Sequence, residues 1–322
     1  MDIVKNLRGI TKEEAIHSYE ELQKVPCNEL TLSMGRAGMK ALDYYFFHHR
    51  IKAKTKRHVS FFDILKSPEK VKHLNQLVEQ YKHTKVSGLT RGELLKHQYS
   101  VFQLYYGTIN QFRPMVAKWL YCKLKPKVAI MDFSAGWGGR CLAAMSLNIP
   151  YIGVDSNTKL KTAYTSLVKT YDPKANVKMY FQPSETFDFS KHQYDLVFTS
   201  PPYFKLEEYE IMPDYVSKQN FLDRFFRPVV LAAWAGLKPR GHMALNMPQE
   251  MYEAVKDILP RLKTKYALPL ANRHPGAAAK RQTINQRSKG HHEWIYVWQK
   301  TGGKTRKQAR KPKKRQTLKR KH

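Results

Sequence analysis

Short apolar runs separated by segments with helical spacing occupy the chain from residue 128 onward, and this alternation restricts the fold more than any other feature. Strands that alternate with helices join through right-handed crossovers, so the pattern predicts a mostly parallel sheet with helices on both faces. Tyr266–Leu270 and Trp294–Trp298 are expected to add a final pair of strands. The five earlier runs are Val128–Met131, Tyr151–Val154, Val177–Phe181, Asp195–Phe198 and His242–Leu245.

In the first 125 residues the pattern predicts helices rather than alternating strands and helices. Thr11-x-x-Glu14 and Thr90-x-x-Glu93 have the spacing of a capping box ahead of amphipathic stretches. Ser67-Pro68 is typical of an N-cap followed by a proline in the first helical turn. The pattern therefore indicates a helical region before the sheet.

The stretch Arg36–His58 mixes basic residues with the consecutive aromatic residues Tyr44, Tyr45, Phe46 and Phe47. Two interpretations remain open for it. The cations can meet phosphates while the rings stack on unpaired bases, which suits nucleic acid. Alternatively, the aromatic residues belong to a helix core and the charged residues form its wet face.

The chain is strongly basic, with 57 Lys and Arg residues against 26 Asp and Glu residues, a formal net charge of +31. Residues 300–322 hold 12 of the basic residues and no acidic ones, so residues 1–299 still carry an excess of 19. This last segment is too poor in apolar side chains to pack, and it predicts a solvated arm. A folded domain this positive attracts polyanions, among which nucleic acid is favoured over an anionic membrane surface.

Cys27, Cys122 and Cys141 are widely spaced and form no Cys-x-x-Cys pair. Their spacing argues against a zinc knuckle and against a secreted disulfide scaffold, and it indicates a reducing compartment. No stretch is long and apolar enough to span a bilayer, and the first residues lack the pattern of a signal peptide. We therefore expect a soluble intracellular monomer, cytoplasmic or associated with the nucleus or nucleoid, with no membrane partner.

A glycine-rich turn, Asp132–Arg140, follows the first predicted strand and opens a helix. Its glycines let the backbone approach a ligand, and the helix N-terminus favours an anionic group. A dinucleotide fingerprint would need a small residue where Cys141 stands, so NAD fits poorly. Asp132 is a candidate for a ligand ammonium, and Asp155 is either an acceptor for both hydroxyls of a ribose or a helix N-cap. Together these groups match S-adenosylmethionine.

The most specific segment is Tyr194–Phe204, in which a strand runs into Ser200-Pro201-Pro202-Tyr203. Proline fixes φ and removes a donor, so a hydroxyl, outward carbonyls and an aromatic ring meet at the carboxyl edge of the sheet. A plain Pro-Pro turn that ends a buried strand is the alternative interpretation.

These residues resemble the amino-methyltransferases that modify the exocyclic nitrogen of adenine or cytosine, whose signature is (Asp/Asn/Ser)-Pro-Pro-(Tyr/Phe/Trp). The resemblance implies that Ser200, Pro201, Pro202 and Tyr203 are catalytic. Ser200 and the Pro201 carbonyl would accept from the target amino group, and Tyr203 would stack on a flipped-out base. Positioning then supplies most of the catalysis. The implied fold is α/β, a Rossmann-like class I methyltransferase with a mostly parallel seven-stranded sheet and an antiparallel last strand, and the implied cofactor is S-adenosylmethionine.

Other segments carry the resemblance further. Gln111–Pro114 resembles the family segment that covers the methionine end of the cofactor, and Ser184 and Glu185 occupy the region that meets its adenine. In the glycine turn, Phe133, Ser134 and Trp137 depart from the frequent Asp-Pro-Phe-x-Gly-Ser-Gly form. The implied cofactor-binding residues are Gln111, Phe112, Arg113, Pro114, Asp132, Ser134, Ala135, Gly136, Trp137, Gly138, Asp155, Ser184 and Glu185.

The resemblance covers residues 110–299, which we take as the methyltransferase domain. Residues 1–109 are then a helical, basic N-terminal region, and residues 300–322 a basic disordered tail. Only 68 positions separate Asp132 from Ser200, too few for a recognition domain between the two motifs. Target recognition is therefore expected from the N-terminal helices, from the basic segment 271–292, or from both, while the tail adds nonspecific phosphate contacts.

DNA is the expected partner and substrate. Serine at the first motif position slightly favours cytosine N4 over adenine N6, since adenine enzymes more often carry Asp or Asn there. RNA is the principal alternative, because basic helices with exposed aromatic residues suit it equally. A non-catalytic nucleic-acid-binding protein on the same fold and a protein-glutamine methyltransferase are further alternatives. His291-His292-Glu293 is not expected to bind a metal, because adjacent residues of a strand face opposite sides.

Overall fold

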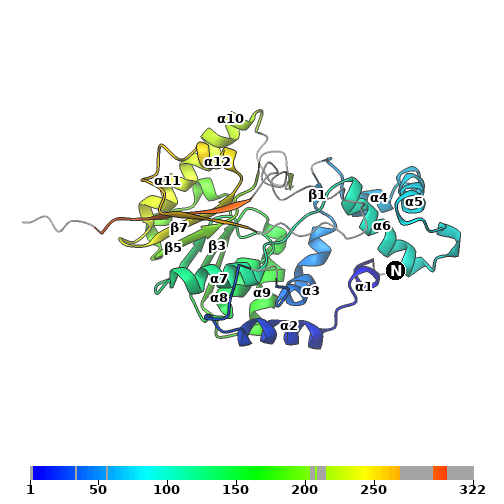
Figure 1. The fold of residues 1–322 in the computed structure, drawn as a ribbon, viewed down its shortest axis with the longest axis horizontal. Coiled ribbons are helices and arrows are strands. Elements are labelled where there is room, and N and C mark those ends of the chain that lie inside the picture. Colours follow the sequence, from blue (N-terminus) through cyan, green and yellow to red (C-terminus); the bar gives the residue numbers. More distant parts are fainter. Residues whose placement is uncertain are drawn as a thin grey trace, which may run out of the picture.

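Seven strands form one sheet in the order β4-β3-β2-β5-β7-β9-β8, and this sheet organises the larger part of the molecule (Figure 1). The computed structural model describes residues 3–32, 35–55, 57–203, 215–268 and 293–302, together with the backbone of residues 207–208. The predicted basic segment 271–292 and residues 303–322 of the tail therefore lie outside the described residues. The strands are β2 (Ile130–Asp132), β3 (Tyr151–Asp155), β4 (Val177–Phe181), β5 (Leu196–Thr199), β7 (His242–Met247), β8 (Thr264–Ala267) and β9 (Trp294–Gln299).

The direction of the strands agrees with the prediction. β2, β3, β4, β5 and β7 pair in parallel, whereas β9 runs antiparallel between β7 and β8. This order, with its single reversed strand, is the Rossmann-like class I methyltransferase fold, so the predicted fold class is confirmed. The central strands β2, β3 and β5 are short and almost completely buried, because both faces of the sheet are covered by helices.

Alternate residues of the strands enter two cores, one on each face of the sheet. Ile130 and Leu196 belong to the core that also contains α7, α8 and α9. Met131 and Val197, one position further along, belong to the core under α11 and α12. The helices of the first face are α7 (Pro114–Leu124), α8 (Gly139–Met145) and α9 (Lys161–Tyr171); those of the second are α10 (Lys218–Phe221), its π-helical continuation η5 (Leu222–Phe226), α11 (Arg227–Gly236) and α12 (Gln249–Glu253).

The predicted N-terminal helices are present, and the capping signals mark where three of them begin. The side chains of Thr11 and Thr90 each accept from the backbone N–H of the glutamate three residues on, which completes both capping boxes. Ser67 caps a helix whose first residue is Pro68. The helices are α1 (Ile3–Leu7), α2 (Lys12–Lys24), α3 (Met39–Arg50), α4 (Phe61–Leu65), α5 (Pro68–Lys82) and α6 (Arg91–Tyr105), and the short 3-10 turns of the chain are η1 (Val86–Gly88), η2 (Thr158–Leu160), η3 (Ser184–Thr186) and η4 (Phe189–Lys191).

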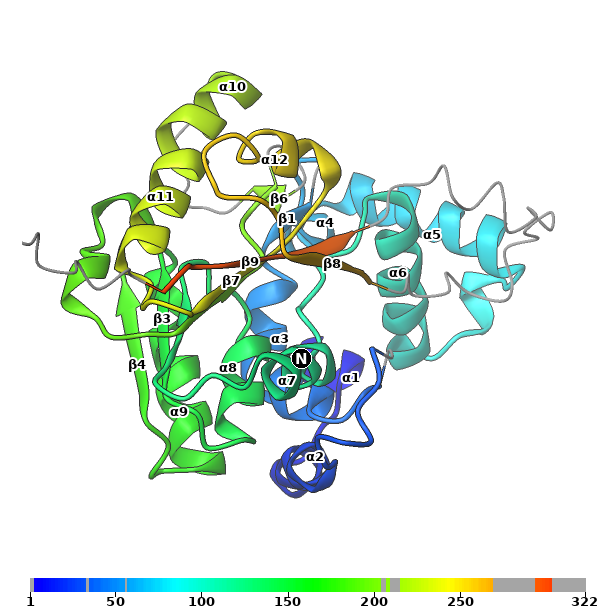
Figure 2. The ribbon, with the colours of Figure 1, turned by 60° about the vertical axis from the view of Figure 1, so that its left-hand side comes forward.

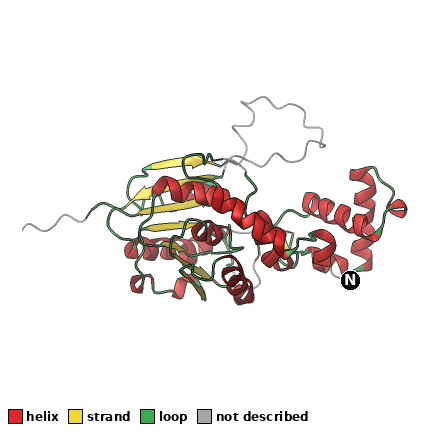
Figure 3. Ribbon diagram, turned by 90° about the horizontal axis from the view of Figure 1, so that it is seen from below, coloured by secondary structure: helices red, strands yellow, loops and turns green. Residues whose placement is uncertain are grey.

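These helices divide between two cores. α2 and α3 share the core of the sheet's first face, to which they contribute Leu22, Leu42 and Phe46. α4, α5 and α6 surround a small core of their own that includes Ile64 and Phe102. Figure 3 shows this second group at the right, beside the sheet domain rather than over it. The sequence pattern does not distinguish the two groups, because both are amphipathic helices with similar spacing.

The consecutive aromatic residues of α3 face different surroundings. Phe46 and Phe47 are completely buried, so the core interpretation is confirmed for them. Tyr45 is half-buried, and its hydroxyl lies 2.6 Å from Oγ1 of Thr170 on α9. Tyr44 is 36% exposed. Within the described part of this stretch, Tyr44 is therefore the ring most accessible to a base.

A two-stranded sheet connects the N-terminal region to the segment that follows the Ser-Pro-Pro-Tyr motif. β1 (Lys54–Thr55) pairs antiparallel with β6 (Glu207–Glu208), with Lys54 opposite Glu208. Figure 2 shows β1 and β6 together beside α4. The sequence offers no signal for this contact, since each strand has only two residues.

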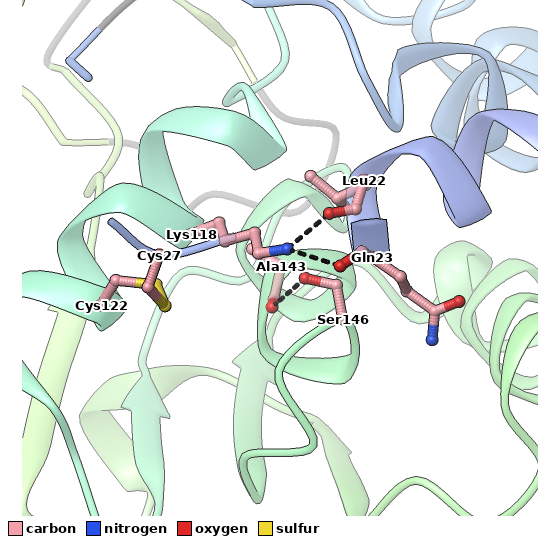
Figure 4. The surroundings of a disulfide bond; sticks show 7 residues. All are labelled: Leu22, Gln23, Cys27, Lys118, Cys122, Ala143 and Ser146. Atoms are coloured by element: carbon pink, nitrogen blue, oxygen red, sulfur yellow. Dashed lines mark hydrogen bonds between the residues drawn. A yellow bond between two sulfur atoms is a disulfide. The ribbon is translucent and has the colours of Figure 1, made fainter. Parts of the chain in front are cut away.

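A disulfide joins Cys27, just beyond α2, to Cys122 in α7, with the two Cα atoms 5.5 Å apart (Figure 4). The spacing of the cysteines does not predict this pair, which closes a loop across 95 positions. The buried ammonium of Lys118, also on α7, donates to the carbonyl oxygens of Leu22 at 2.5 Å and Gln23 at 3.1 Å. Those carbonyls end α2, so a charge-assisted cap and a covalent bond fix α2 to α7. Cys141 is free and buried.

Reduction of the disulfide is expected to lower the free energy of unfolding by about 2–4 kcal/mol, because the unfolded chain regains the freedom of a long loop. Urea unfolding with and without dithiothreitol measures this difference. The double variant Cys27→Ser/Cys122→Ser should match the reduced protein and should not respond to the reductant. Identical unfolding midpoints for the wild type in both conditions would contradict the prediction.

None of the helices in the described ranges is long and apolar enough to cross a membrane.

Candidate active site

The carboxyl ends of β2, β3 and β5 meet at one edge of the sheet. The chain proceeds from β2 toward β4 on one side and continues with β5 on the other, so the strand order reverses between β2 and β5. Open α/β sheets bind ligands in the crevice at such a point. Asp132 ends β2, Asp155 ends β3 and Ser200 follows β5. The structure therefore brings the predicted glycine turn and the predicted catalytic motif to the same edge.

Asp155 holds the glycine turn from the neighbouring strand. Its Oδ2 accepts from the backbone N–H of Gly136 at 2.7 Å, and its Oδ1 accepts from that of Asn157 at 2.8 Å. Each carboxylate oxygen retains a further lone pair for a ligand hydroxyl. Burial raises the pKa of Asp155 to about 6, against the lowering effect of these two hydrogen bonds. The carboxylate therefore changes charge close to neutral pH.

Asp132 has a different environment from the one the sequence suggests. Its carboxylate is completely buried, and Oδ2 accepts from Nε of Arg140 at 2.6 Å and from the hydroxyl of Tyr151 at 2.5 Å. Arg140 also donates to the backbone carbonyl of Ser134. Burial alone would lower the pKa of Arg140, but Asp132 raises it above its ordinary value, so the pair is ionic. Through these hydrogen bonds the buried Asp132–Arg140 pair stabilises the glycine turn.

The remaining residues of the turn keep it close to the sheet. Gly136 and Gly138 have positive φ angles of 59° and 77°, which glycine adopts without strain. The N–H of Ala135 donates to the carbonyl of Val154 at 3.0 Å. Trp137 is 6% exposed, so its ring belongs to the core.

The segment Gln111–Pro114 lies directly against the start of α8. A Cβ atom built on Gly139 would lie 1.9 Å from the carbonyl oxygen of Phe112, so the backbones approach as closely as a glycine permits. The ring of Phe112 packs edge-on against Phe198 of β5, at 5.4 Å between centroids, which places it between the turn and the catalytic motif. Arg113 is the N-cap residue of α7, and Pro114 is its first residue.

Gln111 has one satisfied and one unsatisfied amide atom. Its Nε2 donates to Oδ1 of Asp43 at 3.1 Å, whereas the buried Oε1 has no hydrogen-bond partner among the described residues. Buried polar atoms are normally paired, so this oxygen is an acceptor whose hydrogen bond is unaccounted for within that part of the chain.

Ser184 and Glu185 follow β4 at the same edge. The hydroxyl of Ser184 is buried and donates to the carbonyl of Phe133 at 2.5 Å, so this side chain supports the glycine turn. Glu185 is exposed, and its Oε1 accepts from the hydroxyl of Tyr215 at 2.9 Å.

The Ser-Pro-Pro-Tyr motif is held by β7. Ser200 donates from Oγ to Oδ1 of Asn246 at 3.2 Å, and the Tyr203 hydroxyl donates to the Asn246 backbone carbonyl, also at 3.2 Å. The Ser200 and Tyr203 oxygens lie 3.4 Å apart. Pro201 is buried, and Pro202 and Tyr203 are half-buried. The motif thus forms a fixed cluster at the carboxyl edge.

Sequence reasoning missed Asn246 and Glu293. Asn246 is the fifth residue of β7, and Thr199 pairs with Leu245, so Ser200 and Asn246 are the next residues along two adjacent strands. Glu293 precedes β9. A polar residue near the end of an otherwise apolar strand was the signal available for Asn246.

The described ranges contain no group of three or more metal-ligating side chains. His291 and His292 lie outside them, so the prediction that His291-His292-Glu293 binds no metal stays a prediction.

Comparisons with known proteins find similarity in structure. No family model matches the chain, and no curated protein matches it. TrmN from Thermus thermophilus shares 12% identity and a TM-score of 0.41, over 72% of this chain and 79% of that chain. The M. jannaschii tRNA m1G37 methyltransferase shares 11% identity and a TM-score of 0.36, over 58% and 49%. The Burkholderia thailandensis 1,6-didemethyltoxoflavin-N1-methyltransferase, solved with S-adenosylhomocysteine, shares 13% identity and a TM-score of 0.38, over 57% and 76%.

Proposed function

We propose that the protein transfers a methyl group from S-adenosylmethionine to the exocyclic amino nitrogen of a base in DNA, with cytosine N4 slightly favoured over adenine N6. The observation that supports this most is the position of Ser200–Tyr203. The motif follows β5, and β5 pairs directly with β2, which leads into the glycine turn. A base held at Ser200 would therefore lie beside a cofactor held at the turn.

The residues around the turn fit S-adenosylmethionine, which supplies an activated methyl group when bound. The unpartnered Oε1 of Gln111 would accept from its ammonium, and Asp155 would accept from the ribose hydroxyls. Gly136 allows the backbone to approach the ligand closely. Ser184 and Glu185, at the end of the next strand, would border the adenine. Asp132 would act indirectly, since Arg140 and Tyr151 occupy its carboxylate.

Catalysis at this site requires positioning rather than a nucleophile. Ser200 and the carbonyl of Pro201 would accept the two hydrogens of the target amino group, which turns the nitrogen lone pair toward the methyl group. Tyr203 would stack on the base. Cys141 takes no part, because burial raises the pKa of its thiol far above the ordinary value and leaves it inert.

The charge of the chain supports nucleic acid as the partner. Cations also sit over rings in the α4–α6 group and its flank, where the Arg57 guanidinium lies 4.5 Å from the Tyr105 ring centroid and the Lys66 ammonium 4.5 Å from that of Phe62. Such pairs combine a phosphate-binding charge with a flat apolar surface. We assign target recognition to this N-terminal surface together with the segment 271–292.

Cofactor affinity is expected to fall as the pH drops through about 6. The pKa of Asp155 is raised to about 6, so its carboxylate is ionised above this pH and accepts from both hydroxyls, whereas below it a proton blocks one oxygen. Each pH unit below the pKa should weaken binding by up to about tenfold. Titration of S-adenosylmethionine between about pH 5 and pH 8 measures the effect. Asp155→Asn should bind weakly without this dependence, the exposed control Asp188→Asn should keep it, and a flat wild-type profile would exclude Asp155 as the ribose acceptor.

Removal of residues 303–322 is expected to flatten the salt dependence of nucleic-acid binding and to spare turnover at low salt, because 11 basic residues are lost. The cut falls after Gly302 because Lys300 donates to the carbonyls of Trp234, Ala235 and Leu237, which end α11. A neutral Gly-Ser segment of equal length is the control for chain length. Lost turnover with an unchanged salt slope would contradict the assignment.

Incubation with labelled S-adenosylmethionine and separate DNA and RNA pools, followed by nucleoside mass spectrometry, tests the proposed function. N4-methylcytosine or N6-methyladenine in DNA supports it. Label found in RNA alone would show that RNA, not DNA, is the substrate. The absence of label from both pools would overturn the proposal.

A further inference from the structure

Asn246 is a buried amide with no role in the cofactor site. It is 2% exposed, on the strand next to β5. Its Oδ1 accepts from Oγ of Ser200 and its Nδ2 donates to the carbonyl of Trp294, each at 3.2 Å. A buried polar group in a strand is costly unless it is fully hydrogen-bonded, and one of the two hydrogen bonds of this amide goes to Ser200, the first residue of the motif.

Glu293 immediately precedes Trp294, whose carbonyl accepts from Asn246. Its side chain is half-buried, and burial raises the pKa of its carboxyl. The Asn246 amide opposes this rise, so the carboxyl and the amide are neighbours. The Glu293 carboxylate and the Trp294 carbonyl are therefore two acceptors beside the same amide.

The Glu293 carboxylate and the Trp294 carbonyl determine the orientation of the Asn246 side-chain amide. A carboxylate and a backbone carbonyl can only accept, so both require the amide Nδ2. Oδ1 must then face Ser200, and the single hydroxyl hydrogen of Ser200 is directed to it. The lone pairs of Ser200 Oγ are left for a donor at the edge of the sheet. With the reverse amide orientation, Ser200 would instead accept from Asn246 and present its own hydrogen to the site.

We propose that Asn246 and Glu293 are positioning residues that make Ser200 a hydrogen-bond acceptor for the target amino group. The inference rests on the proposed function, because the amino group is the donor that Ser200 would meet. It adds a chain of three side chains, Glu293 to Asn246 to Ser200, in which the distal carboxylate and the Trp294 carbonyl together fix the polarity of the proximal hydroxyl. A target base with a carbonyl in place of the amino group would be rejected by the same polarity.

Steady-state kinetics of three variants tests the inference. Asn246→Leu keeps the size of the side chain but removes the hydrogen bonds to Ser200 and to Trp294, and it should lower kcat about 10- to 100-fold with cofactor affinity unchanged. Glu293→Gln can donate as well as accept, so only the Trp294 carbonyl still requires the amide Nδ2, and kcat should fall about tenfold. Glu293→Asp remains an acceptor only and should retain most of the wild-type kcat.

A control separates positioning from folding. Gln249, on α12, accepts through Oε1 from the Tyr296 hydroxyl at 2.7 Å and makes no hydrogen bond to Ser200. The kcat of Gln249→Leu should therefore match that of the wild type. If Asn246→Leu does not fold, the comparison of Glu293→Gln with Glu293→Asp decides the question. Equal kcat values for these two variants, in an enzyme that methylates DNA, would overturn the inference and leave the function standing. A wild type that methylates no nucleic acid would overturn both.

Binding to modified duplexes provides a second readout. The wild type should bind a duplex that carries the target base more tightly than one in which the amino group is replaced by hydrogen, and Asn246→Leu should lose this preference. An unchanged preference in Asn246→Leu would show that Ser200 does not depend on Asn246 for its polarity.

Discussion

Ser200→Ala is expected to lower the rate of methyl transfer by about 100-fold or more, with the affinity for S-adenosylmethionine unchanged. The substitution removes the acceptor for one amino hydrogen while the glycine turn, held by Asp155 and by the Asp132–Arg140 pair, is untouched. The amino group would then be held only by the Pro201 carbonyl, and its lone pair would be less well aligned with the methyl group.

Tyr203 allows the ring and the hydroxyl to be separated. Tyr203→Ala should lose transfer to a similar extent, because it removes the surface on which the base stacks. Tyr203→Phe keeps the ring and loses the hydroxyl, with its hydrogen bond to the Asn246 carbonyl and its contact with Ser200, so it should retain substantial activity.

Single-turnover methylation and cofactor titration measure these effects independently. Ser166→Ala, a serine substitution in α9 on the first face of the sheet, is the matched control for Ser200→Ala and should behave as the wild type. Full turnover in both Ser200→Ala and Tyr203→Ala would place the active site elsewhere.

Gly139→Ala is expected to lower the free energy of unfolding by about 3 kcal/mol. The added methyl group would lie 1.9 Å from the Phe112 carbonyl oxygen, a backbone atom that no side-chain rotation can remove. Phe112 has little room to retreat, because its ring packs against Phe198 at 5.4 Å and under the Arg140 guanidinium at 5.2 Å. The clash would separate Gln111 from the glycine turn, so cofactor affinity should fall by about tenfold or more.

Urea unfolding and cofactor titration of Gly139→Ala measure the two effects. Gly88→Ala in η1 is the matched control, since a Cβ atom there meets nothing within 4 Å. Its stability and affinity should equal those of the wild type. Wild-type affinity in Gly139→Ala would mean that the close approach of Phe112 and α8 does not shape the cofactor site.

The sheet was predictable because each strand is a short apolar run between helical segments. Such runs are typical of parallel strands whose two faces are both covered by helices. Successive side chains of a strand point to opposite faces, so neighbours such as Ile130 and Met131 belong to opposite cores. The helix starts at Thr11 and Thr90 were equally readable, because a capping box is a local interaction between residues three apart.

Other features depend on contacts that sequence spacing does not encode. Cys27 and Cys122 meet because α2 lies beside α7, which no local pattern indicates. Asp132 ends a strand, as expected of a ligand-binding carboxylate. However, Arg140, at the start of the helix that follows, donates a hydrogen bond back to it. Asn246 joins the catalytic motif only through the lateral pairing of β5 with β7.

The packing of α3 decides how the protein can be divided. A Cβ atom on Gly138 would lie 2.8 Å from the ring of Phe46, so this α3 side chain closes the glycine turn from behind. The disulfide and Lys118 fix α2 to α7, and β1 extends the backbone hydrogen bonding of the segment beyond Tyr203. A fragment that begins at residue 110 would therefore expose the back of its own glycine turn. The smallest fragment that keeps this turn intact must include α2 and α3, whatever the boundaries of the sequence motifs.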